Sequence, residues 1–593
     1  MDSRVCITFS DLFDTHSTMD ELVEIMRGIP LKHAVNVILA MNLFVRFSMQ
    51  TNKRVNFGKT QELLSAWHLD DEAFGLLKAR FPLARCEDRP IFLPHNTLAI
   101  LRIAIANCDP LPEPDESDDA RVRYAVGRAC LMMNDLLFTP ADQASLTIGT
   151  EAERRVALMA HAIGGFELTN PTRPDHLMPR FQIMFRVLLN DPNVRSRIAQ
   201  GCRQFDFLRE FESRVGISVE RWVFVVFSIW AYFLNGANPN EPRSDFMLIN
   251  PSVFCGESGI TQEEFGTVLG TLSFGISDLR ASLITEAATD PRLDFVAFRS
   301  KPLLCLDGER LHPVDLSFIA DKCHTGVQWT LHDLLPSPKL RQDLFNAWGA
   351  LFEEYVHWLL TGIQSKSGMQ YFPRPNWKGM EDEALDGVLL QGDVFTPLEC
   401  KGGFLSKEAR YSGNPTLLLA DIDKKFAIGC DQLAQKIGSL FADDKDTKKE
   451  LDGVSTAGVR VVLPILVLQD HILRVPLLNW YLNRRFQAKM RPHTTRAGVS
   501  IRPLTVICVQ DLESAVHTIE GDGFDLIYAI HNRAITDPNM LSILGDFLRC
   551  FTNYGRSPSP RIVNVLKTVQ SDLSRYLFPD QVHVVPQRST DPM

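Results

Sequence analysis

The order of predicted helices and strands after residue 340 constrains the fold of this chain more than any other feature. Residues 342–360, QDLFNAWGALFEEYVHWLL, carry apolar side chains at the spacing of a long amphipathic helix. The segments that follow alternate between the two-residue period of strands and the longer period of helices, which is typical of a small mixed α/β domain. Strands are predicted at 369–373, 384–390, 395–401, 459–468 and 503–509, and helices at 416–441, 475–489, 511–518 and 540–551.

The first 299 residues show a different pattern, which is mainly helical. Residues 31–49, 151–166 and 219–234 carry apolar residues three and four positions apart, and Thr261 with Glu264 has the form of a capping box. The acidic, proline-rich segment 109–119 has nothing to bury and predicts a solvent loop between helical subdomains. This half indicates a helical scaffold or recognition region. Its sequence contains no motif that points to a particular reaction.

A chain of 593 residues is too long for one hydrophobic core, so several domains are expected. Asp307-Gly308 between two short apolar runs predicts a hairpin, and a helix is expected from Leu316 through the Trp329 region. We therefore predict a helical region at 1–299, a connector of hairpin and helix at 300–340, and the α/β domain at 341–593.

The composition indicates a cytoplasmic protein. Charged residues make up 23% of the chain, its net charge is −10, and its 12 cysteines show no C-x-x-C pair and no zinc spacing. The N-terminus lacks the basic and apolar regions of a signal peptide. The most apolar run, 222–234, falls short of the roughly 20 residues of a membrane span and predicts a buried core helix.

Four charged positions in the α/β region are candidates for a functional site: Glu353, Asp386, Glu399 and Lys401. On a helical wheel Glu353 lies beside the core-facing stripe, whereas Glu354 points closer to solvent together with His357. We therefore prefer Glu353 as the acid that faces the sheet. The alternative is that both glutamates are ordinary residues of the helix surface.

Glu399 and Lys401 are expected on one face of a strand, because side chains alternate along an extended chain. Asp386 lies within the apolar segment ALDGVLL, where a buried carboxylate needs a partner or a metal ion. The alternatives are an exposed ion pair for Glu399 and Lys401, and a turn at Asp386-Gly387. Taken together, the charged residues favour a site for Mg²⁺ or Mn²⁺, which prefer oxygen ligands.

The predicted ligands are Asp386, Glu399 and the main-chain carbonyl of Cys400. The ion would polarise a phosphodiester and lower the pKa of a bound water. Lys401 would orient that water, help to deprotonate it, or offset charge on the phosphate.

This arrangement resembles the PD-(D/E)xK superfamily of restriction-endonuclease-like nucleases over roughly residues 340–510. Glu353 on a helix, Asp386 on one strand and Glu399-Cys400-Lys401 on the next carry the resemblance, together with the helix that follows. It implies an αβββαβ core and metal-dependent cleavage of nucleic acid. Two departures stand out: Leu385 replaces the proline before the aspartate, and Lys436 occupies the tyrosine position of the exonuclease-like branch. The overall layout also resembles that of a group of uncharacterised bacterial proteins ending in such a nuclease domain. It comprises the long helical N-terminal half, the DG hairpin, the G-x-x-F-E-x-Y-V helix and the late Asp511-Leu512-Glu513.

A basic segment, NRRFQAKMRPHTTR, is the candidate nucleic-acid contact. Phosphate backbones attract such patches by releasing condensed counterions. The alternative is a solvated basic helix face and loop. Its candidate residues are Arg484, Arg485, Lys489, Arg491 and Arg496.

The sequence thus predicts a cytoplasmic, Mg²⁺- or Mn²⁺-dependent nuclease acting on DNA, in antiviral defence and restriction or in DNA repair. The catalytic residues would be Lys401, Glu399, Asp386 and Glu353. Two alternatives remain: a nuclease directed at RNA, and a non-catalytic scaffold that binds nucleic acid or protein and retains a decayed nuclease core.

Overall fold

The computed structural model of this chain forms two compact units, each built from separated stretches of sequence. The first unit comprises residues 1–148, 211–331 and 570–593, and the second comprises 149–210 and 332–569. Residues 149–210, which the sequence groups with the N-terminal helical region, thus belong to the second unit. The structure describes residues 6–50, 54–81, 89–110, 119–137, 149–169, 174–201, 205–236, 249–285, 290, 292–306, 310–363, 368–444, 446, 448–470, 474–475, 477–551 and 559–577.

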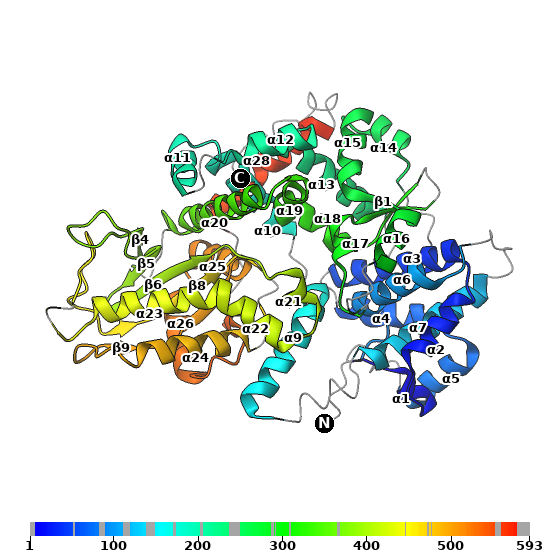
Figure 1. The fold of residues 1–593 in the computed structure, drawn as a ribbon, viewed down its shortest axis with the longest axis horizontal. Coiled ribbons are helices and arrows are strands. Elements are labelled where there is room, and N and C mark those ends of the chain that lie inside the picture. Colours follow the sequence, from blue (N-terminus) through cyan, green and yellow to red (C-terminus); the bar gives the residue numbers. More distant parts are fainter. Residues whose placement is uncertain are drawn as a thin grey trace, which may run out of the picture. The chain divides into compact units, whose positions relative to one another are not determined.

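The first unit is mostly helical (Figure 1). Its predicted helices at 31–49 and 219–234 are confirmed as α3 and α13, and Thr261 and Glu264 form the predicted capping box at the start of α15. The helices of this unit are α1 Phe9–Phe13, α2 Met19–Arg27, α3 Leu31–Gln50, α4 Arg54–His68, α5 Asp71–Arg80, α6 Pro94–Asn107, α7 Asp119–Leu136, α13 Val219–Gly236, α14 Pro251–Glu257, α15 Gln262–Leu272, α16 Ile276–Thr285, α17 Val296–Ser300 and α18 Leu316–Lys322. Helices α12 Phe207–Val215, α19 Thr325–Leu334 and α28 Pro560–Leu577 extend across the boundary between the units.

Helix α13 is a core helix, as its apolar run predicted. Trp222, Val223 and Val225 are completely buried. Within the part of the chain that the structure describes, no single helix is both long and apolar enough to cross a bilayer. One bent pair, Phe207–Val215 with Val219–Leu234, reaches the required length and composition only when its two helices are taken together.

A small three-stranded sheet completes the first unit. Strands β2 Leu303–Cys305 and β3 Leu311–Pro313 pair antiparallel, which confirms the predicted hairpin arms, and β1 Ser273–Gly275 pairs parallel with β2. The Asp307-Gly308 turn itself lies outside the described residues, as does most of the predicted loop at 109–119. The single helix expected from Leu316 is divided into α18 and α19.

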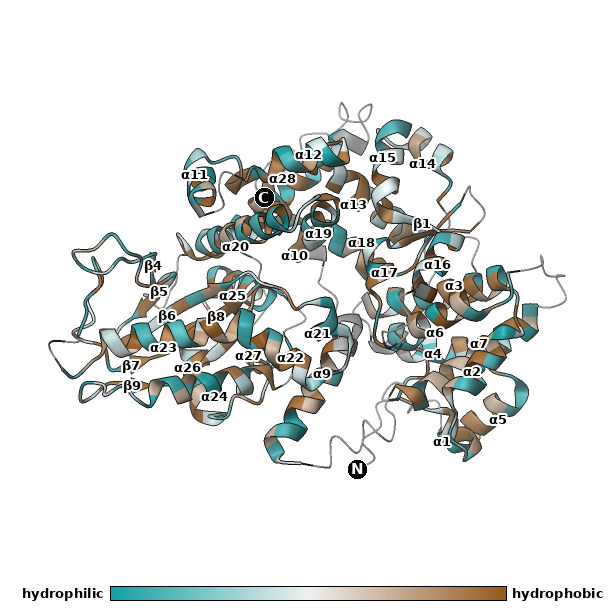
Figure 2. Cartoon of the chain, viewed as in Figure 1, coloured by the Kyte–Doolittle hydropathy of each residue, from teal (hydrophilic) through white to brown (hydrophobic). Residues whose placement is uncertain are grey.

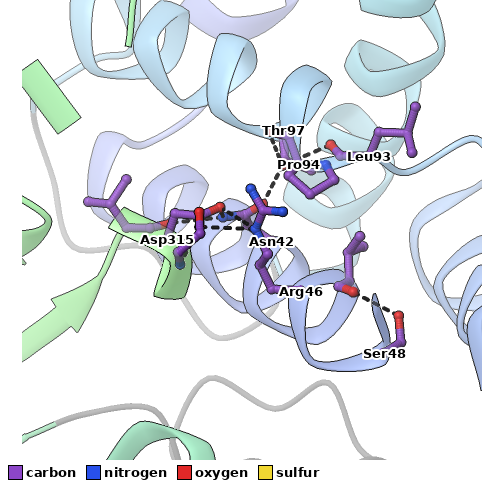
Figure 3. A network of polar contacts seen from close by, with 10 residues as sticks. Asn42, Arg46, Ser48, Leu93, Pro94, Thr97 and Asp315 are labelled. Atoms are coloured by element: carbon purple, nitrogen blue, oxygen red, sulfur yellow. Dashed lines mark hydrogen bonds and ion pairs between the residues drawn. The ribbon is translucent and has the colours of Figure 1, made fainter. Parts of the chain in front are cut away.

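A buried polar network joins three helices of this unit (Figure 3). Asp315 caps the N-terminus of α18 and accepts hydrogen bonds from Arg46 Nε, at 2.8 Å, and from Asn42 Nδ2, at 3.1 Å, both on α3. Thr97 on α6 donates to Asn42. Arg46 and Asp315 are both fully buried, and each charge is stabilised there because it has a charged partner and further hydrogen bonds.

The second unit is built around a mixed sheet. Its main path runs in the order β10-β8-β6-β5-β4, and the short strands β7 and β9 extend from β6. Strands β4, β5 and β6 are antiparallel neighbours, whereas β8 runs parallel to β6 and β10 parallel to β8. The strands are β4 Gln370–Pro373, β5 Gly387–Gln391, β6 Val394–Lys401, β7 Val461–Val462, β8 Ile465–Leu468, β9 Ser500–Ile501 and β10 Thr505–Cys508.

Helices cover both faces of this sheet, and Figure 2 shows their hydropathy along the chain. Buried apolar side chains of the strands and helices form a cluster that includes Val388, Phe395 and Leu433. Lys401 lies against Gly429 of α23 (Ile428–Leu440), whereas the next residue, Gly402, lies against Gly349 of α20 (Pro338–Leu360), so the two helices occupy opposite faces. The remaining helices are α9 Glu151–Thr169, α10 Pro174–Phe181, η3 Gln182–Leu188, α11 Pro192–Gly201, α20 Pro338–Leu360, α21 Lys407–Tyr411, α22 Pro415–Ile422, η5 Asp423–Ala427, α23 Ile428–Leu440, α24 Leu478–Met490, α25 Val509–Asp522, α26 Leu526–Thr536 and α27 Leu544–Arg549.

A buried charge cluster ties the early part of this unit to its late part. Arg180 on α10 donates two hydrogen bonds of 2.7 Å to Glu513 on α25. Tyr355 on α20 donates a third, of 2.6 Å, to the same carboxylate. Because all three side chains are buried, each needs the other two in place.

Two predicted elements differ from the observed ones. The strand predicted at 459–468 is divided into β7 and β8 because Pro464, between them, has no N–H to donate to the sheet. The strand predicted from residue 384 begins only at Gly387. The predicted helix at 416–441 is a continuous helical run that contains the π-helical turn η5.

Candidate active site

Glu399 and Lys401 lie on the same face of β6, as strand alternation predicts. Lys401 Nζ is 2.7 Å from Glu399 Oε1. Glu399 is only 2% exposed, so the pair is not the solvent-exposed ion pair of the alternative interpretation. This part of the site therefore follows directly from the local sequence E-C-K.

A second lysine reaches the same carboxylate from the other side. Lys436 on α23 donates to Glu399 Oε2 at 2.9 Å. The sequence marked Lys436 only as a departure from a family pattern. Gly429 lies two helical turns before Lys436 and contacts Lys401, so α23 approaches β6 along this line of residues. Both oxygens of Glu399 are thus bonded to ammonium groups.

Lys401 is a protonated ammonium group, because its pKa is raised. Burial alone would lower the pKa of its ammonium group, but the charge and hydrogen bond of Glu399, together with the charge of Asp386, raise the pKa above its ordinary value. Lys401 is therefore an ammonium ion at neutral pH and cannot accept a proton from water. Of its predicted roles, orientation of a water and stabilisation of phosphate charge remain.

Asp386 lies immediately before β5. The prediction that it is inside a strand is wrong, because Gly387 is the first paired residue, opposite Leu398 on one side and Pro373 on the other. An isolated turn is not observed either, since the chain continues directly from Asp386 into β5. A Cβ atom at Gly387 would come within 2.7 Å of the Tyr371 hydroxyl, so a larger residue there would displace the Tyr371 ring.

The carboxylate of Asp386 is held beside the end of β6. Its Oδ2 accepts a hydrogen bond of 2.6 Å from the main-chain N–H of Cys400. Burial, with the negative charges of Glu399 and Glu353, raises the pKa of Asp386 to about 8. The side chain is therefore largely protonated at neutral pH when no cation is near, because burial and the two neighbouring acids all disfavour its ionised form.

The prediction that Glu354 and His357 point closer to solvent than Glu353 is wrong. Glu354 is buried because α11 covers that side of α20, and Arg197 on α11 donates hydrogen bonds of 2.6 and 2.9 Å to it. The helical wheel could not show this, since α11 lies far earlier in the chain. Glu353 is more exposed than Glu354, yet it is the one that acts electrostatically on Asp386.

Arg374 joins the two glutamates of α20. Its Nε is 2.8 Å from Glu353 Oε1, and its Nη2 is 2.8 Å from Glu354 Oε1. His357 Nε2 lies 3.2 Å from the same oxygen of Glu353. Burial would raise the pKa of Glu353, but the contacts with His357 and Arg374 outweigh it and lower this pKa. Glu353 therefore stays ionised and fixed in place.

Glu383 is a further acid at the site that the sequence analysis missed. Burial raises its pKa to about 7, with help from Glu353 and Glu399 and against the effect of Arg374 and Lys436. These are residues of the candidate site, so Glu383 belongs to the same electrostatic cluster. Its position three residues before Asp386 is the only sequence signal that could have indicated it.

The negative charge of the cluster suits a divalent cation, but the number of ligands it offers is small. Burial is the largest cause of the raised pKa of Asp386, and the negative charges of Glu399 and Glu353, which a bound cation would compensate, add to it. Among the described residues, however, no three His, Cys, Asp or Glu side chains are grouped so as to hold a metal ion. The predicted set needs two carboxylates and the carbonyl of Cys400, and binding would require a lysine to release one oxygen of Glu399.

The basic segment on α24 and the loop after it is only partly available to a ligand. Arg485 and Lys489 pair with Asp431 at 2.9 and 3.3 Å, and Arg496 lies over the Phe441 ring and donates to main-chain carbonyls. Within the described ranges no carboxylate lies within ion-pair distance of Arg484 or Arg491. Arg484 lies over the Trp480 ring, and it and Arg491 are the two predicted contact residues least engaged by other groups of the described chain.

Comparison with known proteins adds no assignment. No protein-family model, no curated protein sequence and no solved structure matches this chain.

Proposed function

We propose that the second unit is a metal-dependent nuclease that hydrolyses phosphodiester bonds, with DNA as the first substrate to test. The observation that carries this proposal is the position of Asp386, which accepts a hydrogen bond of 2.6 Å from the Cys400 N–H between Glu399 and its bonded Lys401 on the adjacent strand. Burial, with the charges of Glu399 and Glu353, raises the pKa of this carboxyl group. The order of helix α20, strands β4, β5 and β6, helices α22 and α23 and strand β8 supports it, because it follows the αβββαβ order of the family that the sequence resembles.

Asp386, Glu399 and the carbonyl of Cys400 would hold Mg²⁺ or Mn²⁺. When bound, such an ion polarises the phosphodiester and lowers the pKa of a coordinated water. Lys401, as an ammonium ion, orients the attacking water and offsets the charge that develops on the phosphate. Lys436 holds the second oxygen of Glu399, and Arg374 keeps Glu353 ionised beside Asp386.

The test is cleavage of plasmid, linear duplex, single-stranded DNA and RNA in the presence of Mg²⁺ or Mn²⁺, with EDTA as the reference. Lys401→Met and Asp386→Asn should each reduce the rate by at least about 100-fold, the typical cost of removing one group that stabilises the transition state. Lys339→Met, at an exposed position of α20, and Asp382→Asn, exposed in the segment before β5, are the matched controls. Cleavage by Lys401→Met at the wild-type rate would refute the role of Lys401.

A non-catalytic scaffold is the second candidate. It is favoured by the lysine bonds to both oxygens of Glu399, since a site that has lost its metal would keep its carboxylate neutralised in this way. Binding of Mn²⁺, measured by calorimetry on the wild type and on Asp386→Asn, distinguishes the two. Absence of both metal binding and cleavage supports the scaffold, whereas binding that Asp386→Asn abolishes supports the nuclease.

A further inference from the structure

Glu383 is fixed beside the candidate site by the main chain. It forms an antiparallel bridge with Asn376, and the N–H of the next residue, Ala384, donates to the carbonyl of Pro375 at 2.9 Å. These contacts hold the segment that leads to Asp386 against the segment that follows β4. The main chain at Glu383 therefore has a defined position, and its carboxyl group lies 3.8 Å from Arg374, which also contacts Glu353.

Glu383 is the acid of this cluster that is most open to solvent. Its side chain is 39% exposed, compared with 26% for Glu353 and 2% for Glu399. The nearest cation is Arg374, whose Nε lies 3.8 Å away, too far for a hydrogen bond. Glu353 is bonded to Arg374 and His357, and Glu399 to two lysines. Glu383 is the member of the cluster whose carboxyl group is both accessible and not committed to a hydrogen bond among the described residues.

The charged groups around Glu383 come from four parts of the unit. Glu353 on α20 and Glu399 on β6 favour its protonated form, and Arg374 after β4 and Lys436 on α23 favour its ionised form. Burial has the largest effect and also favours the protonated form, so the pKa of Glu383 is raised to about 7. A carboxyl group in this balance carries a proton in a substantial fraction of molecules at neutral pH, as an effective general acid does.

We propose that Glu383 is the general acid that protonates the leaving sugar oxygen in phosphodiester hydrolysis. This inference rests on the proposed nuclease function. The oxygen of the attacking water forms the new bond to phosphorus, the bond from phosphorus to the bridging sugar oxygen breaks, and its electron pair stays on that oxygen. The proton of Glu383 passes to the same oxygen and yields the alcohol. The water loses its proton to solvent, from which Glu383 is protonated again.

The test uses two substrates of identical sequence, one with the natural leaving oxygen and one with sulfur in its place. The bridging position is chosen after the ends of the products have been mapped. A thiolate leaves without a proton, so loss of a general acid slows only the oxygen substrate. Glu383→Gln should therefore lower the rate on the oxygen substrate by about 100-fold, within the range for general acid catalysis, and leave the rate on the sulfur substrate within about twofold of the wild type.

Glu381→Gln is the matched control, because Glu381 is an exposed glutamate in the same segment. It should cleave both substrates at the wild-type rate. Lys401→Met should lose activity on both, since its role does not depend on the leaving group. The wild-type rate on the oxygen substrate should also fall as pH rises through neutrality, and Glu383→Gln should lack this fall.

Two results would overturn the inference while leaving the proposed function in place. One is an equal loss of rate on both substrates in Glu383→Gln, which would indicate a positioning role. The other is no loss on either. If the wild type cleaves neither substrate with either metal, the proposed function fails and the inference fails with it.

Discussion

The raised pKa of Asp386, caused by burial and by the charges of Glu399 and Glu353, should make the stability of the metal-free protein depend on pH in a way that Asp386→Asn removes. The folded-state pKa is about 8, and the ordinary value is 3.8. Below pH 4 the carboxyl is protonated in both the folded and unfolded states, so it costs nothing. Between pH 4 and pH 8 the unfolded state ionises first, and stability is lost until the folded-state carboxyl ionises as well.

The size of this loss follows from the shift. About four units correspond to roughly 6 kcal/mol at 1.36 kcal/mol per unit, and this is an upper limit. Because Asp386 titrates together with Glu399 and Glu353, we take about half of this upper limit, roughly 3 kcal/mol, as the expected loss of stability. For a unit of this size that is about 6 °C in the midpoint of thermal unfolding, at about 2 °C per kcal/mol.

The assay is thermal unfolding in EDTA at pH 5 and pH 8.5. Asp386→Asn should gain about 6 °C relative to the wild type at pH 8.5 and much less at pH 5, whereas Asp382→Asn should follow the wild type at both. Mg²⁺ at pH 8.5 should stabilise the wild type but not Asp386→Asn, since a ligand that binds only the folded state raises its stability. Equal pH dependence in the wild type and Asp386→Asn would refute the raised pKa of Asp386.

Two further predictions concern packing and nucleic-acid contact. Gly402→Ala should destabilise the second unit by about 1–3 kcal/mol, because the new Cβ would lie 2.8 Å from the Cα of Gly349, whereas Gly458→Ala, with open space around it, should change the unfolding midpoint little. Equal unfolding temperatures for the two variants would contradict the close approach of α20 to the end of β6. Arg484→Gln and Arg491→Gln should each weaken DNA binding and reduce by about one the slope of log K against log salt concentration. Arg485→Gln should have a smaller effect, because Arg485 is paired with Asp431. A larger loss of binding in Arg485→Gln would contradict this order.

Local sequence patterns predicted the elements that depend on local interactions. The amphipathic period of residues 342–360 predicted α20, and strand alternation placed Glu399 and Lys401 on one face. Pairings between distant segments could not be predicted in this way. Arg197 buries Glu354 from 157 positions away, and Lys436 reaches Glu399 from 37 positions away. A single sequence carries no local signal for such contacts. Glu354, the more buried of the two glutamates of α20, was therefore predicted to lie closer to solvent.

The discontinuity of the second unit affects how the protein is made and how it can be divided. Arg180 is synthesised 333 residues before its partner Glu513. Helix α10 and the apolar side chains beside it therefore lack their final neighbours during most of synthesis. A fragment that begins at residue 341 would never acquire them. It would leave the carboxylates of Glu354 and Glu513 without Arg197 and Arg180, and its failure to fold would say nothing about catalysis.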